Sequence, residues 1–438
     1  MKKKIISVIC VACFLISCCV ALTGCKTVTG SGVSEAKINE DGELIVIYQD
    51  GTKDNLGVVV GKDGSDGKDG SNTATTGSES DVSAASAKGL LSAVSIVCNF
   101  QTSVQQGGWR PGSSSSSTQD YSSAGSGVIY QLNKEAGDAF IITNYHVVYD
   151  ASNNTKNGIS NDISVYLYGS TTEDTAIKAT YVGGSPYYDI AVLHIDNSDR
   201  LKSANISAVA VADSDKVVVG GRAIAIGNAK GYGISVSSGV VSVDSEYITM
   251  SSADEKSQVS FRVIRVDTAV NSGNSGGGLF DGNGNLIGIV NAKIVDDGVE
   301  NIGYAIPSNV ATSIADNIID YCFGTDVEQV QRALLGISVL ASDSKAVYDS
   351  ETGLLVIEEK VSVYEIDEDS IVKGLFQQDD VFVSITLNGQ KKNITRQYHV
   401  IDMMLNVRVG DVVTFEILRG EETLAVDVTI TEACLTAY

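Results

Sequence analysis

The sequence predicts a mainly β protein built on the plan of a barrel or a sandwich. From Leu90 onward, short runs rich in β-branched and aromatic residues, such as S-A-V-S-I-V-C-N-F and D-I-A-V-L-H-I, alternate with Gly, Asn and Asp turns. This spacing is typical of β-barrels and β-sandwiches. With 438 residues, of which 43% are hydrophobic, the chain is long enough for two or three domains with real cores.

The chain is strongly acidic, with a formal net charge of −23 and a pI near 4.4. Phosphate binding requires a basic surface, so nucleic acid is excluded as a partner class. An acidic surface mainly confers solubility.

The N-terminus has the pattern of an export signal. Three lysines, at residues 2 to 4, precede an apolar stretch from Ile5 to Leu22, which ends in L-T-G-C at Cys25. This ending resembles the bacterial lipobox, which implies that residues 1–24 are a lipoprotein signal peptide and that Cys25 is lipidated and becomes the mature N-terminus. The alternative is an uncleaved transmembrane anchor. Both alternatives place the rest of the chain outside the cytoplasm.

Processing at Cys25 would leave three cysteines, Cys98, Cys322 and Cys434. Three widely spaced cysteines cannot all pair within one chain, so the chain is not a disulfide scaffold. None has metal-ligand spacing, and we expect all three to be buried apolar residues.

Residues 25–88 have the composition of a flexible stalk. Within it, residues 42–60 contain two β-rich runs around an Asp-Gly turn and predict a small hairpin. Gly61 to Gly70 then carries glycine at every third position. This run resembles a collagen repeat, but it is short and lacks proline, so a solvated spacer is favoured. The serine- and threonine-rich run to about Ala87 continues the spacer.

Two further elements interrupt the β pattern. Residues 105–125 contain Trp109 and five consecutive serines and predict a long mobile surface loop. Residues 308–321 have apolar side chains at helical spacing, so we expect a helix there, followed by a domain boundary near Gly324.

Gly273-Asn274-Ser275-Gly276-Gly277 is the stretch most suited to chemistry. A serine with glycine at −2 and +1 can occupy a sharp turn with its hydroxyl exposed and nearby N–H groups converging, as acyl transfer requires. The alternative is a flexible loop, which is plausible in a chain with 44 glycines.

A serine nucleophile needs a base, and the base needs a carboxylate to orient it. Only three histidines are present. His146 lies at the end of a predicted strand, His194 is expected to face solvent by strand alternation, and His399 lies in a predicted helix. Asp189 begins an apolar strand, where a buried carboxylate needs a donor such as a histidine N–H. A turn or strand-edge aspartate is the alternative for Asp189.

Several segments follow in order: I-T-N-Y-H-V-V, D-I-A-V-L-H-I, A-D-S-D-K-V-V-V-G-G-R-A-I-A-I-G-N-A-K-G and D-T-A-V-N-S-G-N-S-G-G-G-L-F. Over roughly residues 90 to 310 the chain thereby resembles the HtrA (DegP-like) family of trypsin-fold serine proteases. The resemblance implies two six-stranded β-barrels in a protease domain over residues 89–323. It also implies a triad with Ser275 as nucleophile, His146 as general base and Asp189 as the orienting carboxylate.

The resemblance extends to the oxyanion hole and the specificity pocket. The hole would be formed by the N–H groups of Gly273 and Ser275, with Asn274 between them. Ser272 and Gly278 stand where the family usually has proline, which would loosen the loop. Ala269 would lie at the pocket base and offers no acid for Lys or Arg, so small or medium aliphatic P1 residues are expected. The remaining substrate-binding positions would be Val270, Ile289, Val290, Asn291 and Ala292.

Residues 328–435 resemble the PDZ domain that follows the protease in this family. Leu335-Gly336-Ile337 would form the loop that binds a peptide C-terminal carboxylate, with an exposed strand edge pairing with the peptide backbone. The alternative is a β-rich domain of another kind.

Together these features predict a serine endopeptidase, lipid-anchored to the bacterial cell membrane and extracytoplasmic, that degrades unfolded or damaged proteins. The resemblance implies a homotrimer, with peptide C-termini as ligands of the PDZ domain. No metal or cofactor is expected. The alternatives are a chaperone-like or sensor binding protein with little proteolysis, and a structural surface lipoprotein.

Overall fold

The computed structural model describes residues 33–39, 41, 43–58, 82–107, 114–155, 157–170, 172–294, 301–350 and 352–437. The chain divides into two compact units, Met1–Thr76 and Gly77–Tyr438. Cys25 and the triplet run Gly61 to Gly70 lie outside the described residues, so the predictions made for them are not addressed by the structure.

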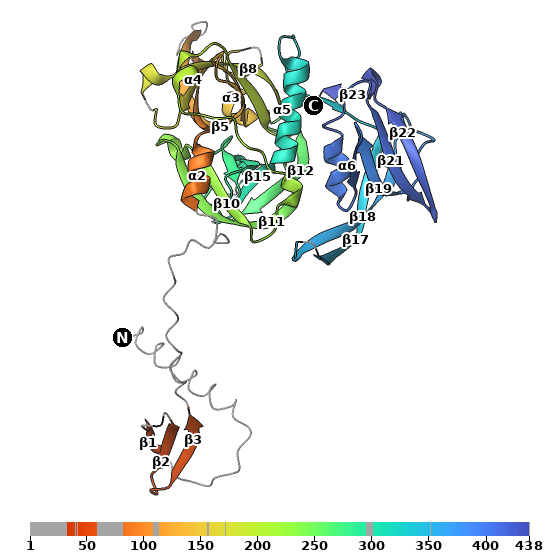
Figure 1. Cartoon of the computed structure of the whole chain (residues 1–438). Helices are drawn as coiled ribbons and strands as arrows, with labels where there is room; N and C mark the ends of the chain where they lie inside the picture. Colours follow the sequence, from red (N-terminus) through yellow and green to blue (C-terminus); the bar gives the residue numbers. More distant parts are fainter. Residues whose placement is uncertain are drawn as a thin grey trace. The chain divides into compact units, whose positions relative to one another are not determined.

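The first unit contains a three-stranded antiparallel sheet in the order β1-β2-β3 (Figure 1). Its strands are β1 (Val33–Ile38), β2 (Glu43–Tyr48) and β3 (Lys53–Val58). The predicted hairpin is confirmed as β2 and β3, joined by a turn in which Gly51 has a φ of +85°. Strand β1 was not predicted.

The second unit begins with two closed six-stranded barrels, which confirms the predicted protease fold. The first barrel has the order β4-β5-β6-β9-β8-β7. Its strands are β4 (Ala93–Gly107), β5 (Ser114–Asn133), β6 (Asp138–Thr143), β7 (Asp162–Leu167), β8 (Ile177–Ser185) and β9 (Ile190–Ile195). The second has the order β10-β11-β12-β15-β14-β13. Its strands are β10 (Arg222–Gly227), β11 (Ser235–Ser251), β12 (Gln258–Val266), β13 (Gly278–Phe280), β14 (Leu286–Val290) and β15 (Gly303–Pro307).

The predicted loop at residues 105–125 is wrong over most of its length. Strand β4 continues to Gly107, and β5 starts at Ser114, so the two form one long hairpin with a continuous register from Ala93↔Val128 to Gly107↔Ser114. Backbone hydrogen bonds hold a β-ladder whatever the side chains are, so the serine run pairs despite its loop-like composition.

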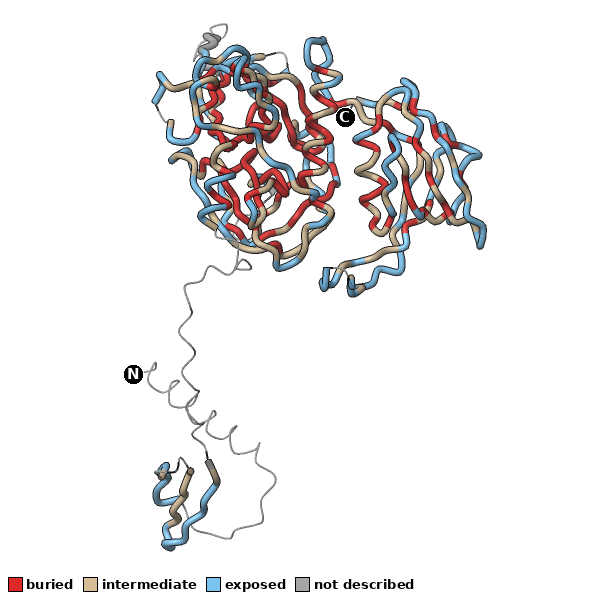
Figure 2. Tube along the Cα trace, in the orientation of Figure 1, coloured by how far each residue is buried: buried red, intermediate tan, exposed pale blue. Residues whose placement is uncertain are grey.

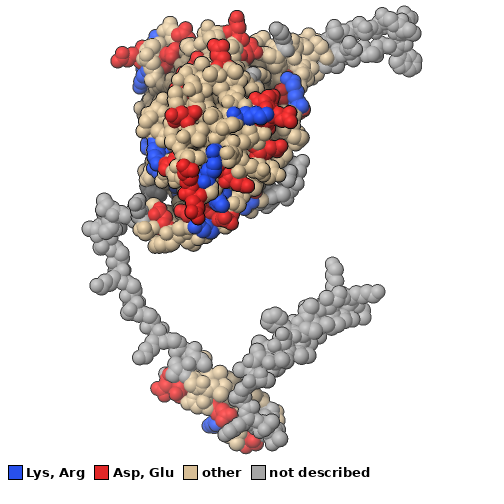
Figure 3. All heavy atoms as spheres, turned by 90° about the vertical axis from the view of Figure 1, so that its right-hand side faces the viewer, with Lys and Arg blue, Asp and Glu red and all other residues tan. Residues whose placement is uncertain are grey.

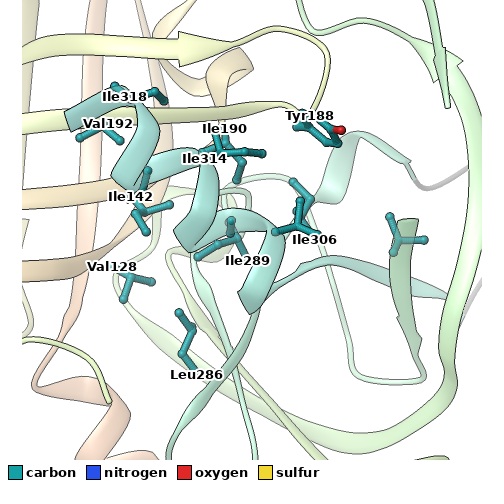
Figure 4. Close-up of a cluster of buried hydrophobic side chains, with 14 of the residues drawn as sticks. Val128, Ile142, Tyr188, Ile190, Val192, Leu286, Ile289, Ile306, Ile314 and Ile318 are labelled. Atoms are coloured by element: carbon teal, nitrogen blue, oxygen red, sulfur yellow. The ribbon is translucent and has the colours of Figure 1, made fainter. Parts of the chain in front are cut away.

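Two helices pack on the barrels. The predicted helix is confirmed as α5 (Ser308–Cys322), whose Ile314 and Ile318 pack against Ile190 and Val192 of β9 (Figure 4). Helix α2 (Val82–Leu90) lies where a spacer was predicted, and it contacts β10 and β13. The shorter helices are α3 (Tyr145–Val148), α4 (Asp199–Ser203), η1 (Glu173–Thr175), η2 (Ser214–Lys216), η3 (Ala229–Gly231), η4 (Ala292–Ile294) and η5 (Glu432–Cys434).

After α5 the chain forms a second β-rich region with its own buried core, seen as the red segments on the right of Figure 2. Its main sheet has the order β17-β18-β19-β21-β22, with β20 paired to β19, and β16 pairs separately with β23. The elements are β16 (Gln331–Ala333), β17 (Ile337–Asp349), β18 (Leu354–Ile366), β19 (Val381–Leu387), β20 (Gln390–Asn393), α6 (Gln397–Met403), β21 (Val412–Arg419), β22 (Glu422–Thr429) and β23 (Leu435–Ala437).

A buried ionic cluster joins this region to the second barrel. Arg262 of β12 makes 2.9 Å ion pairs with both Asp215 and Asp402, and its guanidinium lies 3.7 Å from the ring centre of Tyr398. Lys392 also pairs with Asp215. On the face drawn in Figure 3, acidic and basic side chains are interspersed rather than gathered in a patch of one sign.

The cysteines are placed as the sequence predicts, and His194 is not. Cys98, Cys322 and Cys434 are buried free thiols, as expected, and burial raises the pKa of the Cys98 thiol to about 12. The solvent-facing position predicted for His194 is wrong: its Nε2 lies 2.8 Å from Asp138, and its ring packs on Phe140 and Phe323.

In the part of the chain that the structure describes, none of the helices has the length and apolar character needed to span a membrane.

Candidate active site

The structure brings together His146, Asp189 and Ser275 from three separate segments. His146 lies in α3 directly after β6, Asp189 directly precedes β9, and Ser275 lies in the turn before β13. Asp189 Oδ2 is 2.6 Å from His146 Nδ1, and Asp189 Oδ1 accepts a 2.9 Å hydrogen bond from the backbone N–H of His146. The carboxylate therefore fixes both the imidazole ring and the backbone that carries it.

Asp189 is almost completely buried, at 1% exposure, and has a left-handed φ of 55°. Its Oδ2 also accepts a 2.8 Å hydrogen bond from Asn291 Nδ2, and its backbone carbonyl accepts one from Asn144 Nδ2 at the same distance. The donors from Asn291 and His146 compensate the desolvation of the carboxylate, and the Asn144 bond acts on the backbone carbonyl. They also hold a backbone conformation that non-glycine residues rarely adopt. Asn144 was not predicted as a site residue.

Ser275 is 4% exposed, and its Oγ accepts a 3.2 Å hydrogen bond from the backbone N–H of Ala292. No hydrogen bond joins Ser275 to His146 among the bonds of the described residues. The histidine and aspartate are thus in place, whereas the serine hydroxyl is bonded to the backbone at the start of η4. Catalytic hydrogen bonds are often loose before substrate binds, so this geometry remains compatible with a nucleophile.

The turn around Ser275 requires glycine two residues before the serine and one residue after it. Gly273 has a φ of +96° and Gly276 a φ of +82°. A Cβ would lie 2.3 Å from the carbonyl oxygen of Asn228 at Gly273, and 2.2 Å from that of Ser126 at Gly276. Any side chain would therefore displace the loop from the strands that support it.

The backbone donors in this turn divide into two groups. Those of Asn274, Gly276 and Gly277 bond to carbonyls within 3.0 Å. Those of Gly273 and Ser275 have no acceptor among the described residues. Two unsatisfied N–H groups that flank one residue are the arrangement expected of an oxyanion hole.

Two residues whose hydrogen bonds support this turn were not predicted from the sequence. The Ser126 hydroxyl of β5 donates to the Gly273 carbonyl at 2.7 Å and accepts from the Asn228 N–H at 2.7 Å. The Lys230 N–H donates to the Ser272 carbonyl at 2.7 Å, and Lys230 itself has a φ of 56°. Because the C=O and N–H of a trans peptide point in opposite directions, this second bond turns the Gly273 N–H away from Lys230.

The predicted pocket residues fall into two classes. Ala269 is exposed, Val270 and Ala292 are half-buried, and the Ala269 carbonyl accepts a 2.9 Å hydrogen bond from Ser237 Oγ. The side chains of Ile289 and Val290 are 0% and 1% exposed and belong to the barrel cores. Any contact of these two residues with substrate would therefore be made by their backbone, and their role as substrate-binding positions stays a prediction.

The predicted carboxylate-binding loop lies at the start of β17. Gly336 has a φ of +68°, and the Leu335 and Gly336 carbonyls accept hydrogen bonds from Ser370 Oγ and the Asp367 N–H. A cavity of about 290 Å³ adjoins this loop. It is lined from the C-terminal region by Ile337, Ser338, Val339, Gln397, Ile401 and Asp402, and from the barrels by residues that include Tyr187, Tyr247 and Arg262.

Comparison with known proteins places this site in a family. Residues 125–289 match the trypsin-like peptidase domain model. The chain is 32% identical over 339 residues to the serine protease Do-like HtrA of Bacillus subtilis (strain 168), a match that spans 76% of this chain and 68% of the relative. The chain belongs to the HtrA family.

As an HtrA-family protein, it is a serine endopeptidase. It is also 31% identical over 341 residues to the periplasmic serine endoprotease DegP of Escherichia coli (strain K12), which covers 76% of this chain and 62% of DegP. Among solved structures, the HtrA-type protease AlgW with a decapeptide matches 80% of this chain and 98% of its own, with 24% identity and a TM-score of 0.48.

Proposed function

We propose that this HtrA-family endopeptidase cleaves peptide bonds through Ser275, with His146 as general base and then acid and Asp189 as its orienting partner. The observation that carries the proposal is the buried 2.6 Å contact between Asp189 Oδ2 and His146 Nδ1 beside Ser275. A carboxylate at Nδ1 keeps the proton there, so that Nε2 is free to accept the serine proton.

The chemistry follows from these positions. Ser275 Oγ attacks the scissile carbonyl carbon while its proton passes to His146 Nε2. The developing oxyanion accepts hydrogen bonds from the N–H groups of Gly273 and Ser275, with Asn274 between them. His146 then gives its proton to the leaving amine, and water hydrolyses the acyl-enzyme by the reverse sequence of proton transfers.

We further propose that activity is conditional. Ser275 Oγ is bonded to the Ala292 N–H, at the edge where a substrate backbone would pair. Substrate that engages this edge would release the hydroxyl toward His146, and a ligand of the C-terminal domain could act in the same direction. Equal rates of serine labelling with and without a peptide substrate analogue would contradict this step.

The substrates we propose are unfolded or damaged extracytoplasmic proteins, cleaved after small or medium aliphatic residues. Ala269 and Val270 are uncharged and supply no partner for a basic P1 side chain. Fluorogenic peptides with Val or Ala at P1 are expected to be cleaved faster than matched peptides with Lys or Arg. Comparable rates would refute the predicted preference.

The C-terminal region is proposed to be a PDZ domain, over residues 328–435, that captures peptide C-termini at Leu335-Gly336-Ile337. The left-handed Gly336 and the adjoining cavity support this assignment. A peptide with a free C-terminus should bind more tightly than the same peptide with an amidated one. Equal affinities would remove the carboxylate from the recognition.

We propose a protease domain over residues 89–323, a stalk over residues 25–88 and lipid anchoring at Cys25 after removal of residues 1–24. By family analogy the protein is proposed to be a homotrimer, and a monomeric mass in light scattering would contradict this. The second candidate, a chaperone-like or sensor protein with little proteolysis, is favoured by the bond between Ser275 and Ala292. Casein digestion that is lost in Ser275→Ala would decide for the protease.

A further inference from the structure

Neither face of the three-stranded sheet of the first unit is covered by other residues that the structure describes. Every residue of β1 is exposed and every residue of β2 is half-buried, so no buried segment appears in this sheet in Figure 2. Val33, Ile38 and Leu56 are 58%, 55% and 62% exposed. A sheet this small without a core is marginal in water, and chains of this size usually depend on association. A partner for this sheet is therefore expected.

The register places the apolar side chains of β1 on one face, which also carries Asp54 of β3 opposite Val46, and the charged side chains of β1 on the other face. Ala36 is opposite Val46 and Ile38 is opposite Leu44, so these side chains share one face. Lys37 is opposite Ile45 and, with Glu35, lies on the other face. Neither Glu35 nor Lys37 takes part in an ion pair with the rest of the described chain. Both charges are thus available to a partner at the β1 edge.

We propose that the free edge of β1 pairs antiparallel with β1 of a second copy of this chain, with Ala36 opposite Ala36. In an antiparallel pair, residues directly opposite each other point to the same side of the sheet. Side chains on one face of a strand are two residues apart, so a register that joins the two apolar faces pairs residues whose numbers differ by an even number. The register centred on Ala36 places Glu35 opposite Lys37 twice. Registers centred on Glu35 or on Lys37 place identical charges opposite each other, which destabilises the pair.

The other edge of the sheet offers no equivalent pairing. In β3, Lys53 and Asp54 are adjacent and lie on opposite faces, so no register that joins the apolar faces pairs them with each other. The register centred on Asp54 places two carboxylates opposite each other, which destabilises the pair. Gly57, near the end of β3, has a φ of +86°, which departs from strand geometry. Pairing through β1 alone closes on a twofold axis, so each sheet takes one partner copy and two sheets form one six-stranded sheet.

Charge exchange in the full-length protein tests this register. In an Ala36→Cys background, mild oxidation should join two chains, because residues opposite each other on antiparallel strands lie within disulfide range. Glu35→Lys or Lys37→Glu should each lower the yield of linked dimer by about fivefold or more, and the double exchange should restore it to within about twofold. The chain without the added cysteine is the baseline, and Leu56→Cys, on the exposed edge strand β3, is the matched control.

The proposal is overturned if Ala36→Cys links no faster than Leu56→Cys, or if the double exchange fails to restore linking. A cross-link from residue 36 to the second unit of the same chain would also overturn it, since the occupant of the edge would then be internal. Protease activity is a separate readout, so the result does not depend on the proposed catalytic residues.

Discussion

Replacing Ser126 with alanine should weaken both the fold and the active-site turn. Ser126 is 1% exposed, and its hydroxyl is bonded to the Gly273 carbonyl and to the Asn228 N–H, each at 2.7 Å. The change leaves the buried Asn228 N–H and the half-buried Gly273 carbonyl without this partner. An unpaired buried group costs about 1–3 kcal/mol, and a half-buried group falls at the lower end of that range. We therefore expect the free energy of unfolding to fall by about 2–4 kcal/mol.

The same change should lower kcat more than it alters KM. The lost bond frees the peptide unit between Gly273 and Asn274, next to a proposed oxyanion donor. If about 1.4 kcal/mol of the loss appears in the transition state, kcat falls about tenfold. Steady-state kinetics on a fluorogenic peptide and denaturant unfolding measure the two effects separately.

The matched control is Ser122→Ala on the same strand. Ser122 is exposed and bonds to Asn99 Oδ1 at 2.6 Å, so its loss should cost less than about 0.5 kcal/mol and leave kcat unchanged. If Ser126→Ala loses stability but retains the kcat of Ser122→Ala, then Ser126 supports the fold only, and the link to the oxyanion turn is wrong.

Three further predictions follow from other contacts. Lys230→Gly keeps the N–H that bonds to the Ser272 carbonyl and tolerates the φ of 56°, so kcat should remain within about twofold. Lys230→Ile disfavours this backbone conformation by about 1–2 kcal/mol and should lower kcat at similar KM. Equal kcat values for the two variants would contradict the role of Lys230 in supporting the turn. Arg262→Met leaves Asp402 buried without its cation and leaves Asp215 with Lys392 alone. This change should cost about 3–5 kcal/mol in calorimetric or denaturant unfolding, and a loss below about 1 kcal/mol would show that the pairs are dispensable. Burial lowers the pKa of His399 to about 4, below the value of about 6.5 in an unfolded chain, so the unfolded state binds a proton first as the pH falls. The free energy of unfolding should therefore drop between pH 6.5 and 4 by up to roughly 3 kcal/mol relative to His399→Gln. Burial raises the pKa of Asp402 to about 6, which has the opposite effect on stability, but this effect is present in both proteins. Parallel pH profiles of the two proteins would refute the prediction.

The barrels and the segments that carry the proposed triad were predictable because their signals are local. His146, Asp189 and Ser275 each lie in a short, distinctive sequence segment, and the order of these segments resembles one family. The role of each residue stays a prediction, although the structure brings all three together. The helix over residues 308–321 was predicted from its periodic apolar face and is confirmed as α5.

Other features depend on contacts distant in sequence. Ser126 and Lys230 act through one hydroxyl and one backbone N–H, and neither leaves a pattern along the chain. Helix α2 has a serine- and alanine-rich sequence, and it is positioned by packing: a Cβ at Gly89 would lie 2.6 Å from Ile226. His194 is enclosed by Phe323, which comes from beyond α5, so strand alternation alone misplaced it.

The pairing of Ser114–Asn133 with Ala93–Gly107 shows a further limit. Backbone ladder bonds can extend a hairpin through residues with low strand propensity, because each added pair costs little once the register is set. Composition therefore predicted a loop where the chain forms strands.

The central claim, that Ser275 is a nucleophile activated by His146, is tested most directly by mapping the adduct of a serine-directed fluorophosphonate by mass spectrometry. We predict a single adduct, on Ser275, that is lost in His146→Ala while the variant remains folded. A folded wild-type protein that forms no adduct, or that carries it on another serine, would contradict the claim.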